Sequence, residues 1–223
     1  MRTLTPTLTA LALAAATSLS TLPAAAHPHV WIVSHSDVVF DDQGRITAIN
    51  IEWEFDEFYS MTAVEGLDVN GNGTYEPEEL QPLAAENISA LKDFSYFTKV
   101  RSGSGDEGLG AVTEFHSTFK DSRLTLYFQV PLAAPLDPRK SKVDLRMYDP
   151  SFYIAIEYAA KDPVNAVGTA PDGCAVELRK PDADADDAAS QSEDYFANLL
   201  ATQDLGSIYA ETVVVDCQGK RAS

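Results

Sequence analysis

The chain has 223 residues, of which 34 are acidic and 16 are Lys or Arg, and its formal net charge is −18 at pH 7. Because like charges repel, this balance argues against nucleic acid and anionic lipid surfaces as partners, and it favours cations near the protein. The length suits one domain, or one domain with an insertion, and is ample for a packed core.

The first residues are typical of a secretory signal. Arg2 supplies positive charge, residues 4–22 are almost wholly Ala, Leu and Thr, and alanines at 24–26 suit a signal peptidase. We expect cleavage after Ala26, which leaves a mature periplasmic chain of residues 27–223. A membrane anchor is the alternative, although its prolines and hydroxyl side chains weaken it, and no other apolar run is long enough to span a bilayer.

Most of the mature chain has strand character. Residues 30–40 and 46–55 flank a polar, Gly-containing break and predict a hairpin, because β-branched and aromatic residues dominate both segments. Because turn residues separate the strands at short intervals, we expect a mainly β fold with an antiparallel β-sandwich-like body. Further strands are predicted at residues 97–101, 112–119, 123–130, 143–148, 153–158, 175–178 and 210–215.

Two helical stretches interrupt the strands. Residues 77–94 have apolar side chains at three- and four-residue intervals, and Pro77 stands at an allowed first-turn position. A short C-terminal helix is predicted at residues 192–201, after an acidic, Ala-rich segment that we expect to be a solvated loop. The mature chain, residues 27–223, is therefore predicted to be a single domain with an insertion at about residues 57–94.

The chain has two cysteines, Cys174 and Cys217. In an exported protein an even pair favours a disulfide bond, because the compartment beyond the inner membrane is oxidising. Closing a loop of this length would stabilise the fold by about 4 kcal/mol in the chain-entropy model. A pair of thiolate metal ligands is the alternative.

Residues 68–79 match the twelve-residue EF-hand calcium loop at each position that carries chemistry. A hard cation needs several oxygens around one point, and a tight loop with Gly73 at its bend can wrap them around it. The segment therefore predicts a Ca²⁺ site, which would place an EF-hand-like helix-loop-helix in the insertion. The candidate ligands are Asp68, Asn70, Asn72, the backbone carbonyl of Thr74, and a bidentate Glu79.

The loop departs from the usual pattern in two respects. Tyr75 stands where an aliphatic residue is usual, and the incoming helix, residues 57–66, is short. Two Asn ligands lower the charge of the site, which predicts weak affinity with a Kd on the order of 10⁻⁴ to 10⁻³ M. Such a loop is better suited to holding an insertion in place than to sensing a signal. The alternative is an Asn- and Gly-rich turn that binds no metal.

Three of the four histidines, His27, His29 and His35, lie within nine residues of the expected new N-terminus. In a strand these odd positions share one face, and His27 would also carry the free α-amine. An amine with two or three imidazoles suits Zn²⁺, Cu²⁺, Ni²⁺ or Co²⁺. His116, in another predicted strand, could supply a further ligand from across the sheet, whereas an ordinary strand position is the alternative for His35 and His116.

Pro28 narrows the geometry of an N-terminal site. It has no amide proton, so a copper site that uses the deprotonated amide of the second residue is excluded. The remaining options are a chelate from the amine and ring of His27 with another histidine, or a site made of imidazoles alone.

Several segments of the chain are distinctive: the His27-Pro28-His29 start with residues 30–32, residues 53–60, the EF-like loop, and residues 148–154. Together they resemble an uncharacterised bacterial family with a domain of unknown function, labelled as a periplasmic component of an ABC-type transport system. The resemblance implies a periplasmic location and an association with nickel/cobalt-type permeases, and its His-Pro-His start carries over to His27 and His29. Relatives often have an acidic residue where this chain has Val33 or Ser34, so no acidic ligand is expected there.

The leading hypothesis is a binding module and not an enzyme. It would be a periplasmic metal-binding component of a transition-metal transport or homeostasis system, with a structural Ca²⁺ site and an inner-membrane metal permease as a possible partner. One alternative is a calcium-binding structural or adaptor protein, and another is a copper enzyme that uses His27 in a brace with His29 or His116. The sequence has no nucleophile elbow, metalloprotease helix motif, phosphate loop or matched acid–base pair.

Overall fold

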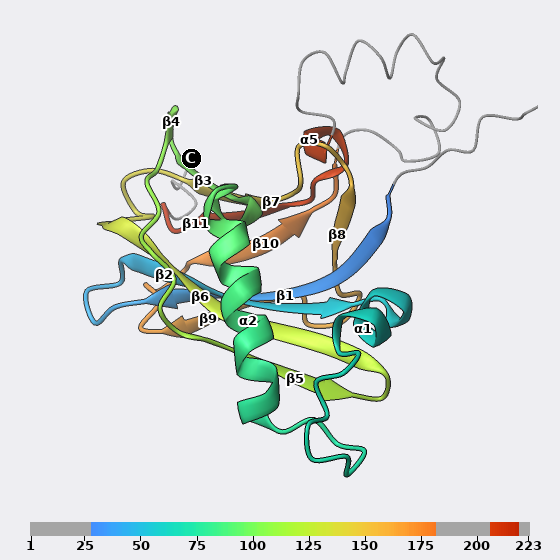
Figure 1. The fold of residues 1–223 in the computed structure, drawn as a ribbon. Helices are drawn as coiled ribbons and strands as arrows, with labels where there is room; N and C mark the ends of the chain where they lie inside the picture. Colours follow the sequence, from blue (N-terminus) through green and yellow to red (C-terminus); the bar gives the residue numbers. More distant parts are fainter. Residues whose placement is uncertain (1–27, 182–205, 219–223) are drawn as a thin grey trace, which may run out of the picture.

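The structure is a computed structural model that describes residues 28–181 and 206–218. Two β-sheets and a few helices make up this part of the chain (Figure 1). Sheet A has the strand order β5-β6-β2-β1-β8, and β9 also pairs with β1. Its strands are β1 (Val30–Phe40), β2 (Ile46–Phe55), β5 (Phe115–Lys120), β6 (Arg123–Leu136), β8 (Ile154–Tyr158) and β9 (Val164–Gly168).

Sheet B has the strand order β10-β11-β7-β3-β4. Its strands are β3 (Thr98–Ser102), β4 (Gly105–Asp106), β7 (Val143–Met147), β10 (Ala175–Arg179) and β11 (Thr212–Asp216). The helices in the described residues are α1 (Glu57–Ala63), α2 (Pro77–Lys92), the 3₁₀ turn η1 (Ser95–Phe97) and α5 (Gly206–Tyr209). None of these helices is long and apolar enough to cross a membrane.

The mainly β prediction is confirmed, and each predicted strand is present, although β6 continues to Leu136 instead of ending at residue 130. Two short strands, β4 and β9, were not predicted. Most strand pairs are antiparallel as expected, but β8 and β9 both run parallel to β1. Strand β8 follows a strand of sheet B, so short turns along the sequence do not determine which strand it pairs with or in which direction.

The core lies between the two sheets and beneath α2. Alternate residues of β1 and β2 are buried, as expected for strands with one face in the core. Helix α2 presents Leu80, Ala84 and Ile88 to the same core, which confirms the predicted helical stripe. The helix ends at Lys92, two residues before the predicted end. The largest fully buried side chains of the core come from both sheets and α2, and include Ile32, Ile46, Trp53, Leu80, Leu124, Leu126, Leu145 and Met147.

The predicted disulfide between Cys174 and Cys217 is present. It closes the open end of the β10–β11 pair, because Cys174 precedes β10 and Cys217 follows β11, and Ala175 lies opposite Asp216 in the register. The predicted C-terminal helix, residues 192–201, and the acidic segment before it lie outside the described residues.

Candidate functional site

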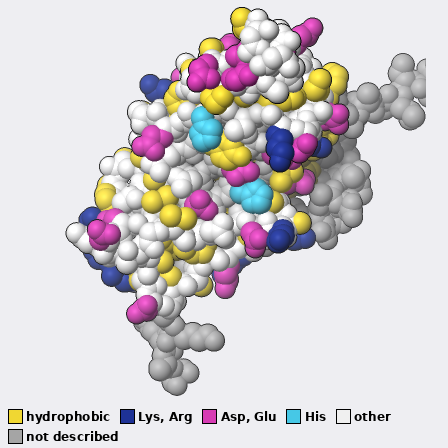
Figure 2. All heavy atoms as spheres, turned by 90° about the horizontal axis from the view of Figure 1, so that it is seen from below, with side chains coloured by type: hydrophobic (Ala, Val, Ile, Leu, Met, Phe, Trp, Pro, Cys, Tyr) yellow, Lys and Arg dark blue, Asp and Glu magenta, His cyan; other side chains and the backbone are white. Residues whose placement is uncertain are grey.

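One face of sheet A is exposed to solvent, and polar side chains occupy it around the middle of β1 and β2. Its side chains come from the odd positions of β1 and from the even positions of the C-terminal half of β2, which the core does not bury. Histidine side chains with acidic side chains near them are seen on one face of the molecule (Figure 2), and a hollow lies among the polar side chains of sheet A. The hollow has a volume of about 610 Å³ and lies over β1, β2, β6 and β5. Side chains that line it include His35, Asp37, Asn50, Glu52, Glu114, His116, Tyr127, Gln129, Asp162 and Asn165.

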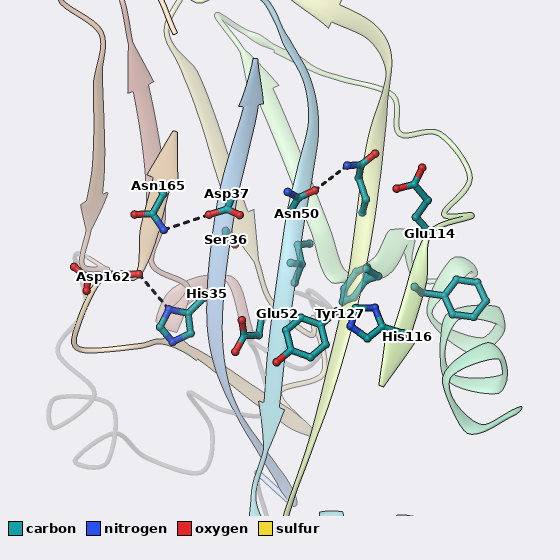
Figure 3. Close-up of a pocket in the computed structure, with 14 residues that line it drawn as sticks. His35, Ser36, Asp37, Asn50, Glu52, Glu114, His116, Tyr127, Asp162 and Asn165 are labelled. Atoms are coloured by element: carbon teal, nitrogen blue, oxygen red, sulfur yellow. Dashed lines mark hydrogen bonds between the residues drawn. The ribbon is translucent and has the colours of Figure 1, made fainter. Parts of the chain in front are cut away.

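The strand register arranges these side chains in two rows across four strands (Figure 3). In the first row, His35 lies opposite Glu52, Glu52 lies opposite Tyr127, and Tyr127 lies opposite His116. Because directly opposite residues on one face are in side-chain contact range, each neighbour in the row is close to the next. We call these four residues the histidine row.

The second row lies two residues further along each strand. Asp37 is opposite Asn50, and Asn50 is opposite Gln129. The side chains are held by two hydrogen bonds, in which Asn165 Nδ2 donates to Asp37 Oδ1 at 3.2 Å and Gln129 Nε2 donates to Asn50 Oδ1 at 2.8 Å. The backbone nitrogen of Gln129 donates to the carbonyl of Glu114 at 3.1 Å, which brings Glu114 to the end of this row.

The two histidines of the histidine row have different surroundings. His35 Nδ1 lies 3.1 Å from the carbonyl oxygen of Asp162. A carbonyl can only accept, so Nδ1 carries the hydrogen, and in the neutral ring Nε2 is then a hydrogen-bond acceptor. The His116 ring stacks on the Tyr127 ring, with centroids 4.7 Å apart and an interplanar angle of 8°.

The structure does not bring the described histidines to one point. His29 lies just before β1, where its ring packs against Tyr153 at 4.6 Å between centroids. Six residues of strand separate it from His35, which is roughly 20 Å at the usual rise, and three strand spacings put His35 roughly 14 Å from His116. Each distance is too long for two imidazoles to share one ion. Within residues 28–181 and 206–218, no three His, Cys, Asp or Glu side chains form a metal-binding group.

His27 lies outside the described residues, so the structure does not place the His27 and His29 pair. The strand register places His35 and His116 in the histidine row, whereas His29 lies just before the start of β1. His29 and His116 therefore cannot ligate one ion together, and a copper brace of His27 with either of them stays a prediction.

The loop of residues 68–79 connects α1 to α2 and turns its oxygen atoms inward. The Asp68 carboxylate accepts hydrogen bonds from the backbone nitrogens of Asn72 and Gly73, at 3.1 and 2.9 Å. Asn70 Oδ1 accepts from the nitrogen of Asn72 at 3.0 Å, and Asn72 Oδ1 accepts from the nitrogen of Thr74 at 2.7 Å. These short-range bonds fix the side chains of the first, third and fifth loop positions against the loop backbone.

Two carboxylates complete the loop. Glu79 accepts from the nitrogen of Val69 at 2.9 Å and from the nitrogen of Glu76 at 3.2 Å, so it joins the beginning of the loop to the start of α2. Glu76 accepts from the side chains of Asn72, Asn70 and Thr74. The hydrogen bond from Asn72, followed by one with Glu79 and those from Thr74 and Asn70, lowers the pKa of Glu76 to about 2.

Glu76 was not among the predicted ligands, although it occupies the ninth position of the loop, where a ligand often acts through water. The candidate ligand atoms of the loop are all oxygens, from carboxylates, side-chain amides and the backbone carbonyl of Thr74, a set that suits a hard cation such as Ca²⁺. The predicted ligands Asp68, Asn70, Asn72 and Glu79 are therefore brought together by hydrogen bonds within one loop.

The loop is anchored to sheet A at both sides. Tyr75 packs edge-on against Phe119 of β5, with ring centroids 4.8 Å apart. Helix α1 is shorter than predicted, but Asp56 caps it by accepting from the nitrogen of Tyr59 at 2.9 Å. Ser60 of α1 accepts from the nitrogen of Leu124 in β6 at 2.9 Å. The aromatic Tyr75 thus takes a packing role in place of the usual aliphatic residue.

The fold and these features define a mainly β protein with two sheets, a polar hollow on one sheet and an acidic loop between two helices. The chain belongs to the family described as "Protein of unknown function (DUF1007)", which matches residues 12–217. This confirms the expected membership in an uncharacterised family, whereas the transport label and the nickel/cobalt association stay predictions.

Two relatives have been found by sequence comparison. An "Uncharacterized protein" of Haemophilus influenzae is 24% identical over 198 residues, which are 86% of this chain and 92% of that protein. An "Uncharacterized 15.5 kDa protein in trpE 3'region" of Spirochaeta aurantia is 33% identical over 97 residues, which are 44% of this chain and 69% of that protein. Neither description states an activity or a ligand, so the function is argued from the sites of this chain.

Proposed function

We propose that this protein is an exported, periplasmic metal-binding protein in which Ca²⁺ binds the loop of residues 68–79 and holds α2 on sheet A. The observation that carries the proposal is the hydrogen-bonded loop itself. Its first and twelfth positions, Asp68 and Glu79, both bond backbone nitrogens of the opposite part of the loop. The loop would thus be the calcium-dependent part of an EF-hand-like helix-loop-helix built into a sandwich-like β body.

Calcium would neutralise charge in a loop where Asp68, Glu76 and Glu79 each accept hydrogen bonds, although these carboxylates do not form a three-residue metal-binding group in the described part of the structure. Tyr75 and Leu80 attach the loop to the core. A loop ordered by Ca²⁺ would therefore also order the first turn of α2. A weak site, with a Kd on the order of 10⁻⁴ to 10⁻³ M, would suit a compartment with abundant calcium.

Replacement of Glu79 by glutamine is expected to abolish calcium-dependent stabilisation. Glutamine can still accept a hydrogen bond from the nitrogen of Glu76, so the variant should fold, but it cannot chelate Ca²⁺ with two carboxylate oxygens. At 10 mM Ca²⁺, the wild-type protein should gain roughly 1.4 to 2.7 kcal/mol for the Kd range given above. Thermal denaturation with and without Ca²⁺ measures the difference.

The matched control is Glu78→Gln, since Glu78 is exposed and makes no hydrogen bond with a described residue. This variant should keep the full response to calcium. An equal calcium-induced rise in Tm in wild type and Glu79→Gln would rule out the assignment.

A second candidate function is capture of a transition metal at the N-terminus, for delivery to or removal by an inner-membrane permease. It is favoured by the position of His29, which is exposed at the start of β1 and lies beside the half-exposed Tyr153. Cleavage after Ala26 would add the amine and ring of His27 to this site, and such nitrogen donors suit Zn²⁺, Cu²⁺, Ni²⁺ or Co²⁺.

One residue added ahead of His27 is expected to weaken transition-metal binding strongly if the amine is a ligand, whereas His29→Ala should have the larger effect if only imidazoles bind. Binding should fade as the pH falls through about 6.5, because protonated imidazole cannot ligate a metal. Titration of the four metals into the mature protein and both variants, with His116→Ala as the control, measures this. Unchanged affinity in both variants would leave the calcium-binding structural or adaptor protein as the better hypothesis.

A further inference from the structure

The hollow on the exposed face of sheet A is lined by charges of one sign. It contains the carboxylates of Asp37, Glu52, Glu114 and Asp162, and its described lining includes neither Lys nor Arg. None of these four carboxylates forms an ion pair with a described residue. By contrast Glu54, on the same strand and face as Glu52 but outside the hollow, lies 3.7 Å from Arg123.

Among the carboxylates of the hollow, Glu52 is the one with the least evident structural role. It is half-buried in the histidine row, between His35 and Tyr127, and it makes no hydrogen bond or ion pair with a described residue. Because Glu52 lines the hollow and no described side chain neutralises it, its carboxylate is available to pair with a cationic ligand.

The hydrogen bonds already formed leave the hollow rich in acceptors. His35 donates through Nδ1, which leaves Nε2 as an acceptor, and Gln129 donates through Nε2, which leaves Oε1 as an acceptor. With the carboxylates, these atoms exceed the remaining donors, such as the Tyr127 hydroxyl and Asn50 Nδ2. An ammonium group has three donors and no acceptor, so it complements such a surface.

The carboxylates are grouped at two ends of the hollow. Asp37 and Glu52 lie on β1 and β2, whereas Glu114 lies next to β5, roughly 14 Å from Asp37 by three strand spacings. Between the two ends lie the neutral side chains of Asn50, Gln129 and Tyr127. This spacing favours a ligand with a cationic group at each end, and it disfavours a bare metal ion, which needs its ligands around one point.

We propose that this hollow binds a linear organic cation with two or more amine groups. One ammonium group lies between Asp37 and Glu52 with His35 Nε2 as a further acceptor, the chain runs along the Tyr127 ring, and a second ammonium group meets Glu114. This site is separate from the calcium loop and from the N-terminal histidines, so it does not depend on the proposed function.

Isothermal titration calorimetry of the mature protein with spermidine and putrescine tests the proposal. The titration contains 0.15 M salt to screen the general attraction of an acidic protein, and saturating Ca²⁺ to occupy the loop. We expect one amine per protein, at least tenfold weaker binding in Glu52→Gln and in Glu114→Gln, and at least tenfold weaker binding of butylamine, which has a single charge.

Glu54→Gln is the matched control, because it removes one charge from the same strand and face outside the hollow, and it should leave amine affinity unchanged. Circular dichroism melting of each variant establishes that it is folded. The absence of amine binding, equal weakening in Glu54→Gln and Glu52→Gln, or equally tight binding of butylamine would each overturn the proposal. Calcium binding is measured on the same protein, so failure of this inference and failure of the calcium assignment are distinguishable.

Discussion

Replacement of Trp53 by alanine should lower the free energy of unfolding by about 3 to 5 kcal/mol, the usual cost of removing a large aromatic side chain from a packed core. Trp53 is only 1% exposed and lies on β2, in the middle of sheet A. Its ring meets Phe128 of β6 edge-on, with centroids 5.0 Å apart at 79°. The cavity would therefore open where the sheet packs against the core, and the surrounding strands cannot collapse into it without losing their register.

The chain has a second tryptophan that serves as the control. Trp31 lies on β1, the strand next to β2, but on the exposed face, and is 51% accessible to solvent. Trp31→Ala should cost less than about 1 kcal/mol, as for most surface substitutions. Urea denaturation followed by circular dichroism compares both variants with wild type. Equal losses for the two would contradict the assignment of Trp53 to the core.

Removal of the disulfide should have the next largest effect, because Cys174 and Cys217 are 43 residues apart in the sequence. Closing a loop of that length stabilises a fold by about 4 kcal/mol in the chain-entropy model, and measured effects are typically 2 to 4 kcal/mol. The variant with both cysteines replaced by serine should therefore unfold at lower urea than wild type. It should also be insensitive to dithiothreitol, whereas wild type should move to the variant's midpoint on reduction. A wild-type midpoint that does not change on reduction would contradict the prediction.

Local features of the fold could be predicted from the sequence because short-range patterns determine them. The β-branched and aromatic residues of 30–40 and 46–55, on either side of a Gly-containing break, predicted the first hairpin, and the spacing of Leu80, Ala84 and Ile88 predicted the buried face of α2. The pairing of Cys174 with Cys217 followed from their number and expected compartment. Strand β9 escaped prediction because its sequence contains Asn, Ala and Gly and lacks a strand pattern.

The residues of the two candidate sites could be predicted to different extents, because one site is local in the sequence and the other is not. The loop of residues 68–79 consists of twelve consecutive residues, so its candidate calcium ligands could be named from the sequence. The hollow draws its residues from strands that are distant in the chain, so Glu52 and Tyr127 could not be associated with His35 and His116 before the register was known. Alternation alone predicts which face a residue occupies, but it does not predict the neighbouring strand.

The position of β1 also determines when the chain can fold. It is the first strand, yet its parallel partners begin only at Ile154 and Val164, so the edge of sheet A beside β1 is completed by segments that are made late. A two-stranded hairpin alone is marginally stable in water, and pairings between distant segments form slowly because a large loop must close first. The chain therefore cannot complete its fold while only residues 30–55 have been synthesised. Sheet A can form completely only after residues 154–168 have been synthesised and can pair with β1.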